Sequence, residues 1–474
     1  MKENKFFKMK NKFRAFFKMD DLKTTTKKEL IGGLTTFLAG VYLLSVEPNM
    51  LSSSPSINGM DDPTLNMAKG GIFLSTIIVM FIGTFIMCLI SNMPAVISPG
   101  MGINAVFTFS VARSVGYEGA LISVMISSIL LCAISCTGLR MLIINSIPDS
   151  IKYAIGAGIG LFVAYLGLKG IKFVEESNGV PVAALSDFSQ YYPSIILGFS
   201  ILAIILFFHF RKIPGAIAIA IFIGLAIAIV FANTLPNSEI VNKNFGSAKW
   251  KGWKYDDFNG FAINLKSTYQ AFVNPEIWTN TTFYISIFIF IFVCFFDATG
   301  AIYSLSQQIS EQTEGGYKVN NRALLGDAIA GVPAGFLGLS ATTTLVESSA
   351  GISQGARTGL SGMFASTLFL SAIALYPLFE MIPVSVSSAS LIFVGSLMIV
   401  QIKEIEWVKP EIAFASFLTM LCMVITFSIT NGIAVGFIMY SLVSLVSKKG
   451  KEVHWMIYVL SILFIFYFAL QSFI

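Results

Sequence analysis

The fold is decided by the stretch Ser340-Ala-Thr-Thr-Thr-Leu-Val-Glu-Ser-Ser-Ala-Gly351. Its residues are small and rich in hydroxyl groups, and long apolar segments flank it on both sides. It holds one carboxylate, Glu347, which by its position lies inside a membrane. A charged side chain at bilayer depth costs on the order of 3 kcal/mol, so it normally faces a cavity, a partner or a ligand. We therefore expect an interrupted membrane crossing beside a binding site.

The composition is typical of a polytopic membrane protein. Of the 474 residues, 55% are hydrophobic and 12% are charged. Apolar runs fill most of the chain, and roughly 20 such residues are enough to cross the hydrocarbon core. The predicted fold class is an all-α polytopic membrane protein forming one integral domain. The net charge of +5 does not indicate a nucleic-acid partner, because Lys and Arg are concentrated in the N-terminal tail and in short loops. The lipid bilayer is the expected partner.

The motifs of several enzyme classes are missing from the sequence. There is no P-loop, no paired-aspartate motif of an intramembrane protease and no metal-ligand cluster. The two histidines, His209 and His454, lie far apart, so they support neither a serine hydrolase nor a metal site. We expect a protein that is not an enzyme and that uses no cofactor and no metal.

A second interrupted crossing is predicted where Pro94, Pro99, Gly100 and Gly102 break an apolar run that ends near Val111. Proline and glycine make an uninterrupted helix improbable. Broken backbone at membrane depth is tolerated only where it lines a cavity or is buried in protein. This stretch, the third crossing along the chain, is therefore expected to line the same site.

A weak internal repeat relates the two halves of the chain. Ile147-Pro148-Asp149-Ser150 recurs as Ile382-Pro383-Val384-Ser385, and at the same offset Gly160 corresponds to Gly395. This alignment pairs the broken third segment with the broken tenth. Because seven crossings is an odd number, the halves must be inverted in the membrane, which is the pattern of secondary transporters. We expect fourteen transmembrane segments arranged as two inverted repeats of seven.

The expected organisation follows from this repeat and from the loop charges. The first repeat covers residues 29–235 and the second 281–447, with an external loop at 236–280 resting on the membrane interface. Residues 1–28 form a basic tail that either lies on the leaflet or is disordered, and residues 448–474 form a basic linker and an extra apolar segment. The tail carries ten Lys and Arg residues, so the positive-inside rule puts the N-terminus in the cytoplasm of a plasma-membrane protein. Arg140 is counted among the loop charges that agree with this topology on the inner side. Whether Trp455–Ile474 crosses the membrane is left open.

Two carboxylates on separate crossings indicate the chemistry of the site. Asp297 lies in the eighth apolar run and Glu347 in the tenth. Ionised carboxylates only accept hydrogen bonds, so a planar heterocycle that presents ring N–H and amino groups suits them. Burial disfavours the charged form, so either residue could also bind and release a proton. The alternatives are a purely structural pair, a channel, and a carrier of inorganic or organic anions, for which a basic residue in the site is expected.

At these residues the chain resembles the AzgA-like branch of the nucleobase–cation symporter family, the adenine, guanine and hypoxanthine permeases. The resemblance runs from about Glu29 to Lys449. Its best-matching pieces are Gly33-Leu-Thr-Thr-Phe-Leu, Ser98-Pro-Gly-Met-Gly-Ile-Asn-Ala, Ile155-Gly-Ala-Gly-Ile-Gly-Leu-Phe, Thr343-Thr-Leu-Val-Glu-Ser-Ser-Ala-Gly, Gly355-Ala-Arg-Thr-Gly and Ser428-Ile-Thr-Asn-Gly-Ile-Ala.

The resemblance implies proton-coupled purine uptake by a core domain that moves against a gate domain, with a homodimer as one possible assembly. Asp297 and Glu347 would bind the base and couple it to protons. The other substrate-binding residues that it implies are Asn104, Gly102, Val346, Ser348 and Thr344, with backbone N–H groups around Val346 to Ser348 as donors. A permease for uracil or xanthine on the same fold is the alternative.

Two departures from the family pattern stand out. The family usually has Phe-Asp-Thr-x-Gly-Thr on the eighth segment, whereas here the threonine is displaced to Thr299 and Ala301 replaces the last one. At the end of the first segment the family usually has Asn-Pro, and this chain has Glu47-Pro48. We expect Glu47 to face water on the outer side rather than to act in coupling.

Overall fold

The computed structural model describes residues 14–54, 57, 62–177, 180–183, 188–213, 215–234, 238–249, 256–311, 321–426 and 429–471. Within this part of the chain, nine helices are long and apolar enough to cross a membrane. Three shorter apolar helices follow at Pro410–Ile425, Asn431–Val446 and Trp455–Ala469. The predicted helical multi-pass membrane protein is therefore confirmed, with four short strands added to the helices.

The first half of the chain contains α2 (Thr26–Gly40), α3 (Leu43–Leu51), α5 (Asp62–Ser91), β1 (Ile97–Pro99), α6 (Met101–Ala105), the π-helix η1 (Val106–Val111), α7 (Ala112–Cys136), α8 (Leu139–Ser146), α9 (Asp149–Gly170), β2 (Val174–Ser177), β3 (Val180–Ala183), α10 (Phe188–Phe210) and α11 (Ala216–Thr234).

The second half contains α12 (Glu239–Phe245), the 3₁₀ turns η3 (Gly246–Ala248) and η4 (Asp256–Asn259), α13 (Gly260–Val273), α14 (Pro275–Thr279), α15 (Thr281–Glu311), α16 (Asn321–Phe336), β4 (Thr342–Thr344), α17 (Ser348–Ser353), α18 (Gly359–Ser371), η5 (Ala372–Leu375), α19 (Tyr376–Glu380), α20 (Val384–Met398), η6 (Ile399–Glu404), α21 (Pro410–Ile425), α22 (Ile429–Val446) and α23 (Trp455–Gln471).

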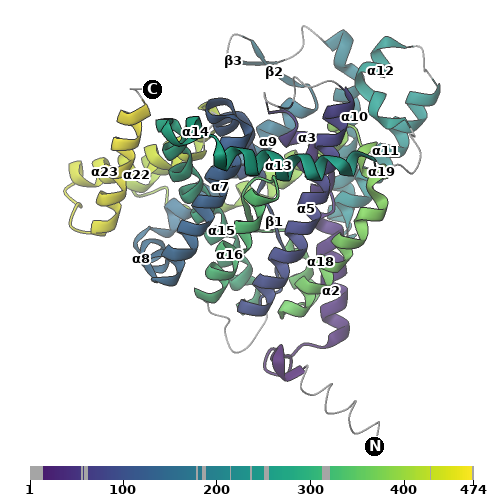
Figure 1. Ribbon diagram of the computed structural model, residues 1–474. Helices are drawn as coiled ribbons and strands as arrows, with labels where there is room; N and C mark the ends of the chain where they lie inside the picture. Colours follow the sequence, from purple (N-terminus) through teal and green to yellow (C-terminus); the bar gives the residue numbers. More distant parts are fainter. Residues whose placement is uncertain are drawn as a thin grey trace, which may run out of the picture.

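Both predicted interruptions are present, and they meet. β1 and β4 pair as short antiparallel strands, with Ile97 opposite Thr344, Ser98 opposite Thr343 and Pro99 opposite Thr342. Figure 1 shows β1 in the middle of the molecule, with helices around it. All six paired residues are buried, so the interrupted backbone satisfies its own hydrogen bonds inside the protein, as membrane depth requires.

The helices form two groups. In the first group α5 contacts α16 and α18, α2 contacts α17 and α18, and α7 contacts α15 and α16. In the second group α9 contacts α20, α21 and α22, and α10 contacts α11 and α20. The strands β1 and β4 belong to the first group, because they contact α5, α15 and α16. Contacts of α9 with α6 and α15 join the two groups at the crossing.

The residues that the repeat pairs also meet in space. Helices α9 and α20 begin directly after Pro148 and Pro383, which fix the backbone before the first turn. A Cβ placed on Gly160 would lie 2.8 Å from the carbonyl oxygen of Gly395. Glycine at this point lets the two helix backbones approach closely. Residues that correspond in the two halves therefore lie against each other, as expected on the axis that relates two repeats.

Two expectations from the sequence are changed by the fold. The described part of the N-terminal tail is ordered on the protein, where Phe17 and Met19 are buried and the Phe17 carbonyl accepts a hydrogen bond of 2.8 Å from the Asn92 side chain. Much of 236–280 is helical rather than a loop. Helix α13 contacts α5, α7 and α16, and it lies across α5 and α7 in Figure 1. Trp250, which belongs to the predicted loop, lies outside the described residues.

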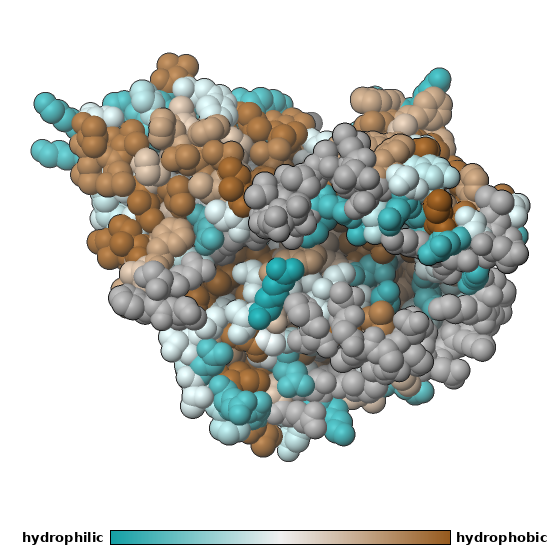
Figure 2. All heavy atoms as spheres, turned by 90° about the horizontal axis from the view of Figure 1, so that it is seen from above, coloured by the Kyte–Doolittle hydropathy of each residue, from teal (hydrophilic) through white to brown (hydrophobic). Residues whose placement is uncertain are grey.

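The last apolar segment packs against both groups as α23. The Phe464 ring stacks on Phe437 of α22 with a centroid distance of 5.9 Å, and it meets Phe292 of α15 edge-on at 4.8 Å. The Ser461 and Ser441 hydroxyls lie 2.7 Å apart. Seen from above, hydrophobic side chains gather over the upper left and upper right of the molecule, and the lower part carries a mixture of hydrophilic and hydrophobic ones (Figure 2).

Candidate functional site

The crossing of β1 and β4 is held by hydrogen bonds that use several of the predicted site residues. The Leu345 N–H donates to the Val96 carbonyl over 2.8 Å, and the Ser348 hydroxyl accepts from the Val96 N–H over 3.1 Å. The Ser348 N–H donates to the Leu345 carbonyl over 3.1 Å. The Ser348 N–H, one of the predicted backbone donors, is thus engaged within the turn after β4, and the Ser348 hydroxyl accepts from the segment that leads into β1.

A cavity of about 300 Å³ opens between the two helix groups beside this crossing. From the first group it is lined by Phe296, Asp297 and Val346, and from the second group by Tyr153 and Met398, among others. Its volume is at the lower end of the range for small-ligand pockets. Two of the predicted site residues, Asp297 and Val346, therefore lie where a small molecule can reach them.

Asp297 lies close to the crossing because glycine leaves room for it. A Cβ placed on Gly100 would lie 2.9 Å from the Asp297 Oδ2 and 2.9 Å from the Thr343 methyl group. The carboxylate thus extends from α15 over the start of the third segment. In this way the three elements predicted to form the site, the eighth, third and tenth segments, come together around one carboxylate.

Glu347 is held by a residue that sequence reasoning missed. The Tyr42 hydroxyl, at the junction of α2 and α3, donates a hydrogen bond of 2.5 Å to Glu347 Oε1. Tyr42 is buried. The Glu347 side chain is partly exposed and lies within electrostatic reach of Asp297. The first helix pair therefore positions the second predicted carboxylate.

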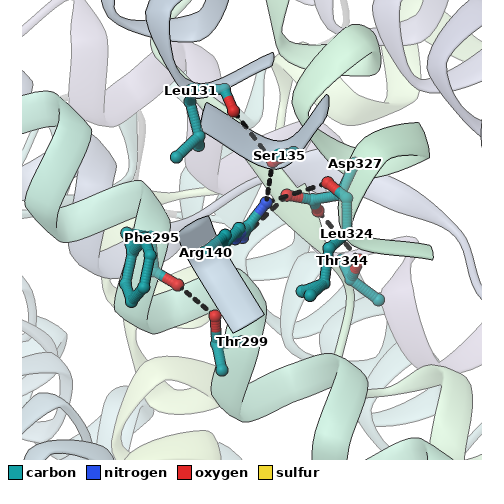
Figure 3. A network of polar contacts seen from close by, with 8 residues as sticks. All are labelled: Leu131, Ser135, Arg140, Phe295, Thr299, Leu324, Asp327 and Thr344. Atoms are coloured by element: carbon teal, nitrogen blue, oxygen red, sulfur yellow. Dashed lines mark hydrogen bonds and ion pairs between the residues drawn. The ribbon is translucent and has the colours of Figure 1, made fainter. Parts of the chain in front are cut away.

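Thr344 does not line the cavity but holds a third carboxylate. Its hydroxyl donates to Asp327 Oδ1 over 2.9 Å, and Asp327 Oδ2 lies 3.8 Å from Arg140 Nη2 (Figure 3). The Arg140 side chain is fully buried, donates to the Leu324 carbonyl over 2.8 Å and lies over the Phe295 ring at 5.5 Å. The assignment of Arg140 to an inner loop is therefore wrong, since its guanidinium pairs with α16 inside the protein.

Glu47 is also buried, which overturns the expectation that it faces outer water. Its side chain is 0% exposed. The Asn104 amide hydrogen-bonds Glu47 Oε2, and the Ser340 hydroxyl lies 3.3 Å from Glu47 Oε1 and also contacts Asn104 Oδ1. Asn104 therefore lies in a closed polar cluster and is not among the residues that line the cavity. The sequence could not indicate this, because partners 57 and 293 residues away supply the cluster.

Gly102 lies at the boundary between the two groups. A Cβ placed on it would lie 2.8 Å from Ile429 Cδ1 of α22 and 3.3 Å from Ile159 Cγ2 of α9. The third segment thus approaches the second group so closely that a side chain at this position has little room. Glycine at this position offers a ligand no polar side chain, and it keeps the third segment close to the second group.

Comparison with known families covers nearly the whole chain. A family model, Xan_ur_permease, described as Permease family, matches residues 27–435. The guanine/hypoxanthine permease PbuG of Bacillus subtilis is 35% identical over 459 residues, which cover 96% of this chain and 99% of that protein. The adenine permease AdeP of Escherichia coli is 29% identical over 458 residues, or 95% of this chain and 94% of that protein.

Solved structures share the fold at low sequence identity. The transmembrane domain of the cyanobacterial bicarbonate transporter BicA superposes with a TM-score of 0.57 at 17% identity, covering 86% of this chain and 96% of that one. The transporter SLC26A9 gives a TM-score of 0.59 at 13% identity, covering 94% of this chain and 70% of that one. These likenesses place the chain in the fold of seven-plus-seven inverted-repeat transporters.

Proposed function

Because the chain belongs to the Permease family, and is thus a membrane transporter rather than an enzyme, we propose that it imports purine nucleobases by proton symport. Adenine, guanine and hypoxanthine are the proposed substrates, in keeping with the printed names of its relatives. The observation that carries the proposal is the cavity of about 300 Å³ in which the Asp297 carboxylate lies beside the Phe296 ring.

The lining of this cavity suits a flat heterocycle. The proposed pose places the base between the aromatic side chains of Phe296 and Tyr153, because ring faces stack well on aromatic surfaces. The Asp297 carboxylate accepts from ring N–H or amino groups, which a purine presents on its edge. Glu347, oriented by Tyr42, accepts from a second edge group when the base reaches the crossing. Val346 closes the cavity on the apolar side.

The remaining predicted residues act indirectly in this proposal. Thr344 fixes the Arg140–Asp327 pair behind the crossing. Ser348 fixes the turn that carries Glu347, and Gly102 spaces the third segment from the second group. These three residues position the two carboxylates rather than contact the base. Asn104 contacts Glu47 away from the cavity.

The proposed transport step is a movement of the first group, as core domain, against the second group, as gate domain. The proposal also has the N-terminus in the cytoplasm and fourteen membrane crossings. In support, a second cavity of about 620 Å³ opens at the other end of α9, lined by Lys169 and Ser388 of the second group and by Asn49 of α3. The two cavities lie at opposite ends of α9, so a rigid movement of Asp297 along that helix would expose the site to each side in turn.

An anion carrier is the second candidate, since Arg140 is a buried basic side chain and the solved structures of this fold include a bicarbonate transporter. Arg140 is, however, engaged by Asp327 and by the Leu324 carbonyl, and it does not line the cavity. The cavity lining does include one basic side chain, Lys152, but it pairs with Asp149 over 2.8 Å, and the carboxylates of Asp297 and Glu404 are also in the lining. The excess of carboxylates disfavours an anion. The geometry therefore favours the nucleobase.

Uptake by cells that lack their own purine carriers tests the proposal. Radiolabelled adenine, guanine, hypoxanthine, uracil, xanthine and bicarbonate are compared in wild type, Asp297→Asn and Glu347→Gln, with and without a proton uncoupler. We expect saturable purine uptake that the uncoupler abolishes and that either variant reduces strongly. Uptake of bicarbonate but of no base would establish the anion carrier, and uptake of uracil or xanthine alone would change the substrate class.

A further inference from the structure

We propose that Glu47, Asn104 and Ser340 form a proton-binding site separate from the purine cavity. The inference rests on the proposed function, because it names where the coupled proton is held. The three side chains come from α3, from α6 and from the segment directly before β4. Each is 0% exposed.

The geometry is a closed ring of three contacts. One edge joins Glu47 Oε2 to the Asn104 amide nitrogen, the second joins Asn104 Oδ1 to the Ser340 hydroxyl, and the third joins that hydroxyl to Glu47 Oε1 at 3.3 Å. Each edge needs one hydrogen atom to be a hydrogen bond. The ring therefore needs three hydrogens in all.

Only two of these hydrogens are always present. The Ser340 hydroxyl carries a single hydrogen, which serves one of its two edges and not both. The Asn104 amide oxygen and nitrogen face different partners, so the amide donates to one neighbour and accepts from the other. Turning the amide over reverses the direction of the ring but leaves the count unchanged. The third hydrogen must come from the Glu47 carboxyl group, which completes the ring only when it is protonated.

The surroundings of Glu47 also favour a bound proton. None of the interactions of Glu47 among the described residues involves a basic side chain. Tyr117 of α7 lies within electrostatic reach of Glu47, and its hydroxyl already donates to the Gly338 carbonyl over 3.0 Å. Lys69 of α5 and Glu380 of α19 line a small cavity beside Pro48, on the other face of α3. A bare carboxylate in the ring would thus be a buried charge without a countercharge, which is costly.

Cavities border the neighbours of Glu47 along α3. Val46 and Asn49, which flank Glu47 on α3, line the cavity of about 620 Å³ at the C-terminal end of α9. Pro48 lies inside α3 at this point, and a proline inside a helix removes one backbone hydrogen bond. The other cavity, which contains Asp297, has no residue of α3 in its lining. The ring is therefore placed to take its proton from the α3 side while the base is handled by Asp297.

Ring closure would couple the proton to the transport step. The ring connects α3 and α6 to the segment that leads into β4. A proton on Glu47 therefore stabilises the arrangement of the third and tenth segments, which cross at the purine site. Loss of the proton breaks one hydrogen bond of the ring and leaves a charged Glu47 carboxylate, which must be hydrated. The proton can therefore leave only in the conformation in which this region is open to water.

The test compares the wild-type protein in liposomes with Glu47→Gln and Glu47→Asn. The glutamine side chain supplies the third hydrogen permanently, and asparagine is the residue that the resembled family carries at this position. Two readouts are recorded: exchange of labelled purine across the membrane without a gradient, and protons moved per purine, followed with a pH-sensitive dye. We expect both variants to keep the rate of purine exchange within about twofold of wild type and to lose the purine-dependent proton flux. Their exchange rate should no longer depend on pH.

The possible results separate this inference from the proposed function. If the variants move as many protons per purine as the wild type, the ring is not the proton site. If both variants are folded in size-exclusion chromatography but no longer exchange purine, Glu47 serves binding and the inference is overturned as well. If the wild type itself exchanges purine without moving protons, the proposed symport fails, whatever the variants do.

Discussion

Replacement of Arg140 by methionine is expected to destabilise the protein severely, because it leaves Asp327 as a buried charge without its partner. The two side chains are 0% and 2% exposed, and their closest N–O distance is 3.8 Å. At an effective dielectric constant of about 20, unit charges at that distance attract by about 4 kcal/mol. Breaking a buried pair by removing one partner costs about 3–5 kcal/mol. We expect Arg140→Met and Asp327→Asn each to lower the free energy of unfolding by this amount.

The double variant separates a charge effect from lost packing. Arg140→Met combined with Asp327→Asn removes both charges and keeps an acceptor for the Thr344 hydroxyl. The double variant should therefore lose far less free energy of unfolding than the two single variants together, with a coupling energy of about 3 kcal/mol. Unfolding in mixed micelles by increasing SDS, followed by tryptophan fluorescence, gives the three values. Lys409→Met is the matched control, since its ion pair with Glu406 is exposed and should contribute nothing measurable. Additive costs for the two single variants would refute a charged, buried pair.

Two further predictions concern the crossing. Gly102→Val should slow purine exchange at least tenfold and leave purine binding to the purified protein intact. The valine side chain would contact Ile429 and Ile159 and hinder movement between the two helix groups. Unchanged exchange would show that the two groups do not slide past each other at this boundary. Tyr42→Phe should weaken purine binding at least about tenfold, since a hydrogen bond to a charged acceptor is worth about 1.5–3 kcal/mol. The control is Tyr458→Phe on α23, where the tyrosine hydroxyl donates to the Gly450 carbonyl in the turn before the helix. Equal losses in both variants would mean a general loss of stability.

The broken segments could be predicted because their signals are local. Prolines and glycines at Pro94 to Gly102 interrupt an apolar run, and the small, hydroxyl-rich stretch from Ser340 to Gly351 does the same. Each stretch therefore indicates by its own residues that a transmembrane helix is interrupted there. That the two meet as β1 and β4 followed from the repeat, whose paired residues Gly160 and Gly395 lie in contact. Asp297 and Glu347 stood out for the same reason, as charges in apolar surroundings.

The predictions for Arg140 and Glu47 were wrong because the burial of these side chains depends on partners far away in the sequence. Arg140 follows an apolar run and therefore reads as a loop charge, but Asp327, 187 positions later, draws it into the protein. Asp327 itself carried the same signal as Asp297, an acid within an apolar segment, and could have been found by that rule. Glu47 sits at the end of a crossing, where an acid normally meets water. Its burial depends on Ser340, which no local pattern connects to it.

The most direct test of the central claim is the accumulation of labelled guanine, hypoxanthine and adenine in proteoliposomes under an imposed inward proton gradient, for wild type and Asp297→Asn. The wild type should concentrate at least one of these purines in a saturable manner. The Asp297→Asn protein, with the same fold and the same yield, should not. Accumulation by the variant at the wild-type level, or no gradient-driven accumulation by the wild type, would contradict a purine site at Asp297.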